Sequence, residues 1–106
     1  METAFLEKAQ ELFNRIEAAT ESLSADIETE QSGNVLTLES ETGEQAVLNI
    51  HAPTSEVWLA SRAGGFRFAY DGVKWVASNG HLDIQTALEQ ALSYICNEPV
   101  LFNQKI

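Results

Sequence analysis

The chain has 106 residues, of which 44% are hydrophobic, and its formal charge is −10. This apolar content is sufficient for one folded core, so the composition excludes a disordered chain. A single cysteine, Cys96, excludes an intramolecular disulfide and favours a reducing cytoplasm. The sequence shows no signal peptide and no stretch long enough to span a membrane. We therefore expect one soluble, cytoplasmic domain over residues 1–106.

The negative charge is concentrated in the N-terminal part of the chain. Residues 1–44 contain eleven of the sixteen acidic residues and two of the six basic ones, so they hold nine of the ten net negative charges. Such a field repels nucleic acids and anionic membranes, and it attracts cations and basic protein surfaces. We expect no nucleic-acid or membrane partner, and self-repulsion favours a monomer.

The chain begins with a segment that predicts an amphipathic helix over residues 3–23, because its apolar residues recur at spacings of three and four. Short apolar or alternating segments follow, divided by turn residues, and these predict strands. The expected strands cover residues 26–31, 35–40, 45–50, 57–60, 66–70 and 74–77. A second amphipathic helix is expected over residues 83–96, with Asp83 as its N-cap and Pro99 as its stop.

The connections between the expected strands are short, which limits how the sheet can be arranged. Turns are expected at Gly33-Asn34, residues 41–44, Gly64-Gly65 and Asp71-Gly72. Consecutive strands joined in this way form an antiparallel meander, which commonly buries one face and leaves the other to water. We expect an α+β two-layer sandwich with the N- and C-terminal helices packed on one face, and a docked apolar tail at residues 100–102.

The middle of the chain carries the most specific pattern. It consists of Asn49-Ile50-His51-Ala52-Pro53, then VWLAS over residues 57–61, then Gly64-Gly65-Phe66, Phe68, Gly72 and Trp75. In order and spacing this pattern resembles the bacterial frataxin (CyaY) family, and only His51 departs clearly, where glutamine is usual. The resemblance covers nearly the whole chain. It implies an iron-binding protein of iron–sulfur cluster assembly that donates iron to the cysteine desulfurase–scaffold complex or regulates it, and that is not an enzyme.

Five carboxylates are the candidate metal ligands. Glu17 and Glu21 are four residues apart, so both project from one face of the helix. Asp26, Glu28 and Glu30 alternate, so all three point the same way from a strand. Oxygen-rich groups suit hard cations, so we expect weak surface binding of Fe2+ or Fe3+, with other hard divalent or trivalent cations as substitutes. The alternative is a charged face that is simply solvated.

Trp58 is the candidate for contact with a partner. It alternates with Val57 and Leu59, which should face the core, so Trp58 should lie on the open face of the sheet. An exposed tryptophan is a common anchor of protein contacts, whereas partial packing against neighbouring strands is the alternative. The resemblance implies that Trp58, Asn49 and Arg62 face the assembly machinery.

The remaining residues of chemical interest have plainer expected roles. Trp75 is expected in the core, and His51 and His81 are expected to be surface or loop residues. Cys96 lies next to the apolar stripe of the second helix, so we expect a buried or half-buried small hydrophobic residue.

Two further functions stay open at this point. A ferroxidase would need fixed ligands and an open coordination position, and the sequence has no pair of histidines to supply them. A generic acidic interaction module without iron biology would share the fold and the charge.

Overall fold

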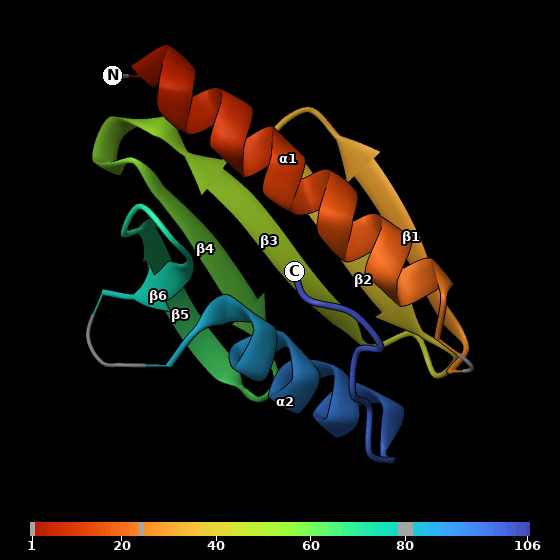
Figure 1. Cartoon of the computed structure of the whole chain (residues 1–106). Helices are drawn as coiled ribbons and strands as arrows, with labels where there is room; N and C mark the ends of the chain where they lie inside the picture. The colour runs from red at the N-terminus through yellow and green to blue at the C-terminus, as the bar shows by residue number, and fades with distance from the viewer. Residues whose placement is uncertain (1, 24, 79–81) are drawn as a thin grey trace.

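The computed structural model describes residues 2–23, 25–78 and 82–106, without the side chains of Glu2 and Thr3. Two layers make up the molecule: a six-stranded antiparallel sheet, and two helices that lie on the same face of it (Figure 1). The predicted α+β sandwich is therefore confirmed.

Helix α1 (Glu2–Glu21) buries one apolar stripe against the sheet. The buried residues of the stripe are Ala9, Leu12, Phe13, Ile16, Ala19 and Thr20. The hydroxyl of Thr20 is satisfied within the helix, because its Oγ1 donates to the Ile16 carbonyl at 2.7 Å. The helix ends two residues earlier than predicted, since the N–H of Leu23 turns back to the Thr20 carbonyl at 3.1 Å in a tighter final turn.

Helix α2 (Ile84–Cys96) begins at the predicted cap. The carboxylate of Asp83 accepts a hydrogen bond from the backbone N–H of Thr86 at 2.8 Å. The residue that ends α2 is Asn97, which adopts a left-handed conformation with φ of 59°, and not Pro99 as predicted. Within the described residues, neither helix is long and apolar enough to cross a membrane.

The strands follow one another through the sheet in chain order. They are β1 (Ile27–Ser32), β2 (Val35–Ser40), β3 (Gln45–His51), β4 (Glu56–Ser61), β5 (Gly64–Tyr70) and β6 (Trp75–Ala77), with a short 3-10 helix, η1 (Ala52–Thr54), between β3 and β4. The predicted turn at Gly64-Gly65 is wrong by two residues. Gly64 pairs with Ser61 and Gly65 with Ala60, so both glycines belong to the ladder and Arg62-Ala63 make the turn.

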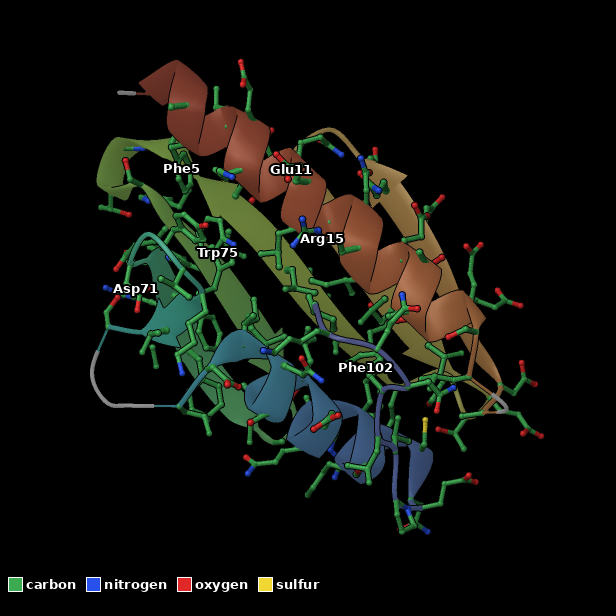
Figure 2. All side chains as sticks on the ribbon, viewed as in Figure 1. Phe5, Glu11, Arg15, Asp71, Trp75 and Phe102 are labelled. Carbon is green, nitrogen blue, oxygen red and sulfur yellow. The ribbon has the colours of Figure 1, made fainter. Side chains whose placement is uncertain are left out.

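Only one face of the sheet is buried. Side chains on β2 and β3 alternate between buried and half-buried, as expected where one face packs and the other meets water. The buried face contributes Leu36, Leu38, Leu48, Val57, Leu59 and Phe68. The C-terminal tail completes this layer, because Val100 and Phe102 are buried while Leu101 is exposed. Phe102 is labelled in Figure 2. Docking of the tail is thus confirmed for two of its three apolar residues.

The cap of α2 leads to a prediction about stability. Replacing Asp83 with alanine removes the acceptor for the Thr86 N–H and should lower the free energy of unfolding by about 1 kcal/mol, or roughly 5 °C in melting temperature. Hydrogen bonding to the Thr86 backbone holds the pKa of Asp83 below its usual 3.8. The contribution of the ionised Asp83 cap to the free energy of unfolding is therefore present at neutral pH. It is lost as the pH falls through the folded-state pKa of Asp83.

Thermal melts of the wild type, Asp83→Ala and Asp83→Asn at pH 7 would check this. The Asp83→Asn protein should melt closer to the wild type than Asp83→Ala does, because asparagine keeps a capping oxygen. Equal melting temperatures for all three proteins would contradict it.

Candidate functional site

The acidic residues picked out by the sequence lie along β1 and the adjoining end of α1, and we call Glu17, Glu21, Asp26, Glu28 and Glu30 the acidic edge. Glu28 and Glu30 are exposed at alternate positions of β1, the first strand of the sheet. They pair with Glu39 and Thr37 of β2, so they stand on the open face, away from the helices. The predicted common direction is confirmed for Glu28 and Glu30, whereas Asp26, predicted to share it, precedes β1 and is not part of the alternating strand.

The helix end of the acidic edge lies on the other side of β1. Glu17 is half-buried, and its carboxylate accepts hydrogen bonds from Gln31 Nε2 at 3.0 Å and Thr29 Oγ1 at 3.4 Å. Thr29 pairs with the buried Leu38, so the Thr29 side chain, and the Glu17 carboxylate hydrogen-bonded to it, lie on the helix-covered face of the sheet. Glu17 is therefore separated from Glu28 and Glu30 by the strand itself.

The two remaining acids extend the acidic edge at the same end of the molecule. Glu21 is the exposed last residue of α1, and Asp26 is exposed immediately before β1. Asp26 shares a small hollow with Cys96 and Glu98 at the end of α2. Within residues 2–23, 25–78 and 82–106, no three histidine, cysteine or acidic side chains gather as a chelating group. The carboxylates form a strip of charge on two sides of a strand.

Two of the six basic residues form ion pairs, and both pair with acids outside the acidic edge. Arg15 of α1 pairs with Glu11 at 3.6 Å, and Arg62 pairs with Glu44 (Figure 2 labels the first pair). In the part of the chain that the structure describes, these are the two ion pairs, and neither includes a member of the acidic edge. The strip therefore keeps its negative charge available to cations from solution or from a basic protein surface.

Trp58 lies on the open face of β4, as predicted, and its indole is held on several sides. Its Nε1 donates to the carboxylate of Glu56 at 3.1 Å. The ring of His51 stacks on the indole with 4.1 Å between centroids and 16° between planes. The guanidinium carbon of Arg67 lies 4.6 Å from the indole centroid, a cation–π contact. His51 comes from β3 and Arg67 from β5, which flank β4 on opposite sides.

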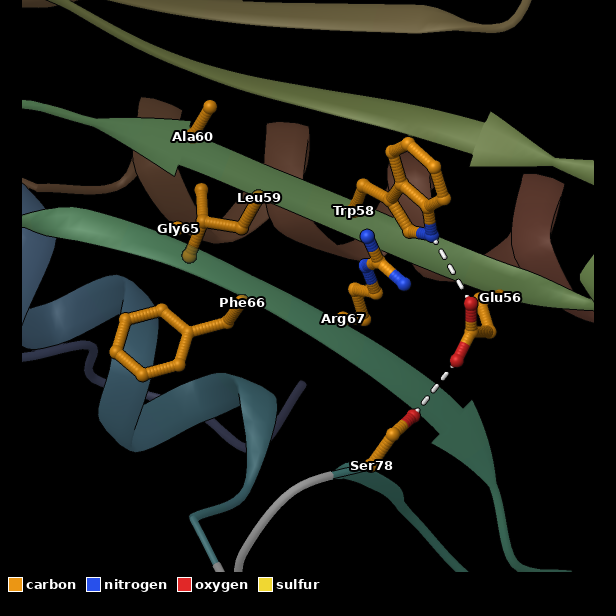
Figure 3. A pocket seen from close by; sticks show the side chains of 8 residues that line it. All are labelled: Glu56, Trp58, Leu59, Ala60, Gly65, Phe66, Arg67 and Ser78. Carbon is orange, nitrogen blue, oxygen red and sulfur yellow. Dashed lines mark hydrogen bonds between the residues drawn. The ribbon is translucent and has the colours of Figure 1, made fainter.

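Glu56 connects this aromatic group to two other segments. Its Oε1 also accepts from Thr54 Oγ1 at 2.9 Å. Its Oε2 accepts from Ser78 Oγ at 2.8 Å, the bond drawn with that from Trp58 in Figure 3. The hydrogen bond from Ser78, followed by the one from Trp58, lowers the pKa of Glu56 below its usual 4.5. Glu56 is thus a carboxylate at neutral pH, and both of its oxygens are used.

A hollow of about 540 Å³ lies beside Trp58 on this face. Figure 3 shows Trp58, Arg67, Glu56 and Ser78 along one side of it. The rest of the lining is Leu59, Ala60, Gly65 and Phe66, and on the open face Ala60 and Gly65 pair across the β4–β5 ladder with little side chain between them. The hollow therefore offers an aromatic edge, a cation and a shallow floor to a protein surface.

The structure separates the three residues predicted to bind a partner. Asn49 pairs with Trp58 across β3 and β4, so the two are neighbours on the open face. Arg62 lies in the turn after β4, has 69% of its side chain exposed, and shares a different hollow with Tyr94 of α2. The cation beside Trp58 is Arg67, which the sequence reasoning missed. The register of the β4–β5 hairpin would have identified Arg67, because Arg67 pairs with Trp58 across the two strands.

The plainer expectations have mixed outcomes. Trp75 is in the core with 5% exposed, and Phe5 meets its ring edge-on at 6.0 Å. His51 ends β3, half-buried and stacked on Trp58, so the expectation of a surface or loop histidine missed its main contact. Cys96 is half-buried, as predicted, and His81 lies outside the described residues.

Three comparisons with known proteins bear on this arrangement. The signature of the family described as frataxin-like domain matches residues 1–98. The iron-sulfur cluster assembly protein CyaY of Vibrio cholerae is 39% identical over 99 residues, which is 93% of this chain and 95% of that protein.

Two solved structures share the fold. The frataxin of Psychromonas ingrahamii has a TM-score of 0.88 and 30% identity, and the match covers 97% of this chain and 98% of that one. A trimeric frataxin of the yeast Saccharomyces cerevisiae, complexed with ferrous ion, has a TM-score of 0.66 and 25% identity, over 89% and 86% of the two chains.

The environment of Cys96 leads to a prediction about its reactivity. Burial, and then the nearby charges of Glu98 and Asp26, raise the pKa of the thiol above its usual 9.0. Because the thiolate is the reactive form, iodoacetamide at pH 8 should alkylate the folded protein more slowly than the urea-unfolded protein. Mass spectrometry of the alkylated fraction over time would measure this. Glu98→Gln should react faster than the wild type, and equal rates in the folded and unfolded proteins would contradict the prediction.

Proposed function

The chain belongs to the frataxin-like family, and from this premise we propose that it works in iron–sulfur cluster assembly as an iron-binding protein and not as an enzyme. The observation that carries the proposal is the match to that family over residues 1–98, together with an acidic edge on the strand and helix where the net charge collects. The relative from Vibrio cholerae is named for this process, and the yeast structure is a ferrous complex.

Iron, in our proposal, is held weakly at the acidic edge. Glu28 and Glu30 are exposed carboxylates on one face of β1 and leave most of the coordination sphere of a metal to water. Hard oxygen ligands of this kind suit Fe2+ and Fe3+ and also accept other hard cations. Weak and hydrated binding permits transfer of the ion, which fits a donor of iron.

The proposed partners are the cysteine desulfurase and the iron–sulfur scaffold protein. The acidic edge would dock a basic surface of the desulfurase, because its carboxylates lie outside the ion pairs of the described chain. Trp58 and Asn49, with Arg67 beside them, would face the scaffold, while Arg62 would contact it separately near α2. As iron donor, regulator or both, the chain would act as a monomeric, single-domain protein in the cytoplasm.

Titration with iron tests where the metal binds. Adding Fe(II) under anaerobic conditions to 15N-labelled protein should broaden the amide resonances of residues 17–30 first, because a paramagnetic ion acts over short distances. The variant Glu28→Gln/Glu30→Gln should need more iron for the same broadening. The matched control Glu7→Gln removes an exposed carboxylate near the start of α1, about 15 Å along the helix from Glu17, and should behave like the wild type on the β1 resonances.

Uniform broadening over the chain, or equal behaviour of the two variants, would contradict binding at the acidic edge. Ferrous oxidation faster than in a matched carboxylate buffer would contradict the non-enzymatic part of the proposal.

Binding to the desulfurase tests the electrostatic part. Reversing charge in Glu28→Lys/Glu30→Lys should weaken the complex at least about ten-fold at low salt, because like charges then face each other. Raising the ionic strength should weaken the wild-type complex through screening and reduce the difference between the two proteins. Calorimetry or biolayer interferometry at two salt concentrations would measure both effects. A wild-type affinity that is independent of salt would count against the acidic edge as the docking surface.

A further inference from the structure

Beyond the docking role proposed for Trp58, and resting on it, we infer that Glu56 is a positioning residue, whose carboxylate holds the indole in the orientation that meets the partner. Glu56 and Trp58 are two residues apart on β4, so their side chains leave the same face of the sheet. The indole N–H, the only hydrogen-bond donor of the ring, is used on Glu56 Oε1 at 3.1 Å.

The carboxylate is itself held from two directions. Thr54 of η1 donates to Oε1 at 2.9 Å, and Ser78, just after β6, donates to Oε2 at 2.8 Å. Thr54 has one hydroxyl proton and gives it to Glu56, so His51 Nδ1, 2.8 Å from Thr54 Oγ1, is the donor in that pair. Glu56 therefore joins β4 to η1 and to the end of β6, and it cannot rotate without breaking these bonds.

The ring faces of Trp58 complete the arrangement. His51 stacks on the indole from β3, and Arg67 lies over the indole from β5, so neighbours on either side limit rotation of the ring. Glu56 also attracts Arg67, whose charge contributes to lowering the pKa of the carboxylate. One anion thus orders the indole through its N–H and favours the guanidinium above it (Figure 3).

Such ordering matters for binding because a rigid side chain loses less conformational entropy when a complex forms. A half-buried tryptophan free to change rotamer would present its edge to the hollow only part of the time. With the indole fixed, the wall of the hollow beside Ala60 and Gly65 exists before the partner arrives. Glu56 acts through Trp58 and need not touch the partner.

A spectroscopic experiment separates positioning from general stabilisation. In 1H–15N spectra, the indole resonance of Trp58 should follow the protonation of Glu56 in the wild type, with a midpoint below the usual 4.5. In Glu56→Gln the resonance should keep its position over the same pH range, because the amide does not titrate. Glu56→Ala should shift the resonance at neutral pH and speed exchange of its proton with water.

The buried indole of Trp75 is the internal reference in every spectrum, and its resonance should stay in place. A Trp58 resonance that is unmoved in Glu56→Ala, or that is insensitive to pH in the wild type, would overturn the positioning role.

The second arm measures affinity for the purified scaffold protein. Glu56→Ala should weaken binding about three- to ten-fold, as expected for loss of a hydrogen bond to a charged group. Glu56→Gln should weaken it less, because the amide oxygen still accepts the indole N–H. The control Glu7→Ala removes the same charge from an exposed position of α1, on the helix-covered side of the sheet, and should bind like the wild type.

The outcomes of this arm are distinguishable. If Trp58→Ala abolishes binding while Glu56→Ala does not weaken it, the positioning role is wrong and the proposed docking face stands. If Trp58→Ala binds the scaffold like the wild type, the docking face is wrong, and the positioning role in recognition is lost with it.

Discussion

The structure depends on the burial of one face of an antiparallel sheet beneath two helices. Leucines of β2, β3 and β4 alternate inward, and the stripes of α1 and α2 cover them. Because side chains alternate with a period of two, the register that buries Leu38 and Leu59 also turns Glu28, Glu30 and Trp58 outward. A shift of one residue in the strand register would turn the leucines outward and the carboxylates and Trp58 inward. The packing of the core and the composition of the open face are therefore determined together.

This constraint places two chemically different groups on the open face, namely Glu28 and Glu30 of the acidic edge, and Trp58 with its neighbours. The acidic edge begins at β1, whereas Trp58 stands on β4, three strands further along the sheet. At about 4.8 Å per strand, β1 and β4 lie roughly 14 Å apart across the sheet. A cation or basic surface at β1 and a protein contact at Trp58 can therefore be accommodated together. In the row of Glu30, the open-face residues between β1 and the neighbourhood of Trp58 are uncharged: Thr37, Val47 and Ala60.

Much of the architecture could be predicted because its signals are local. Apolar spacing predicted both helices, alternation around Val57 and Leu59 predicted the direction of Trp58, and Asp83 was recognisable as a cap. The errors arose where pairing between strands decides the outcome. Arg62 is nearer to Trp58 in the sequence, yet Arg67 is its neighbour, because the hairpin folds β5 back along β4. The same ladder drew Gly64 and Gly65 into β5.

By itself, the sequence determined the number and order of the main elements, the excess of negative charge near the N-terminus and the family resemblance, since each depends on composition or spacing along the chain. Only the tertiary structure decided that Glu17 and Glu28 lie on different sides of β1, and that Glu56, His51 and Arg67 surround Trp58. These contacts join residues on neighbouring strands or on different layers. Their geometry is set by register and by the packing of helix on sheet, which spacing along the chain does not encode.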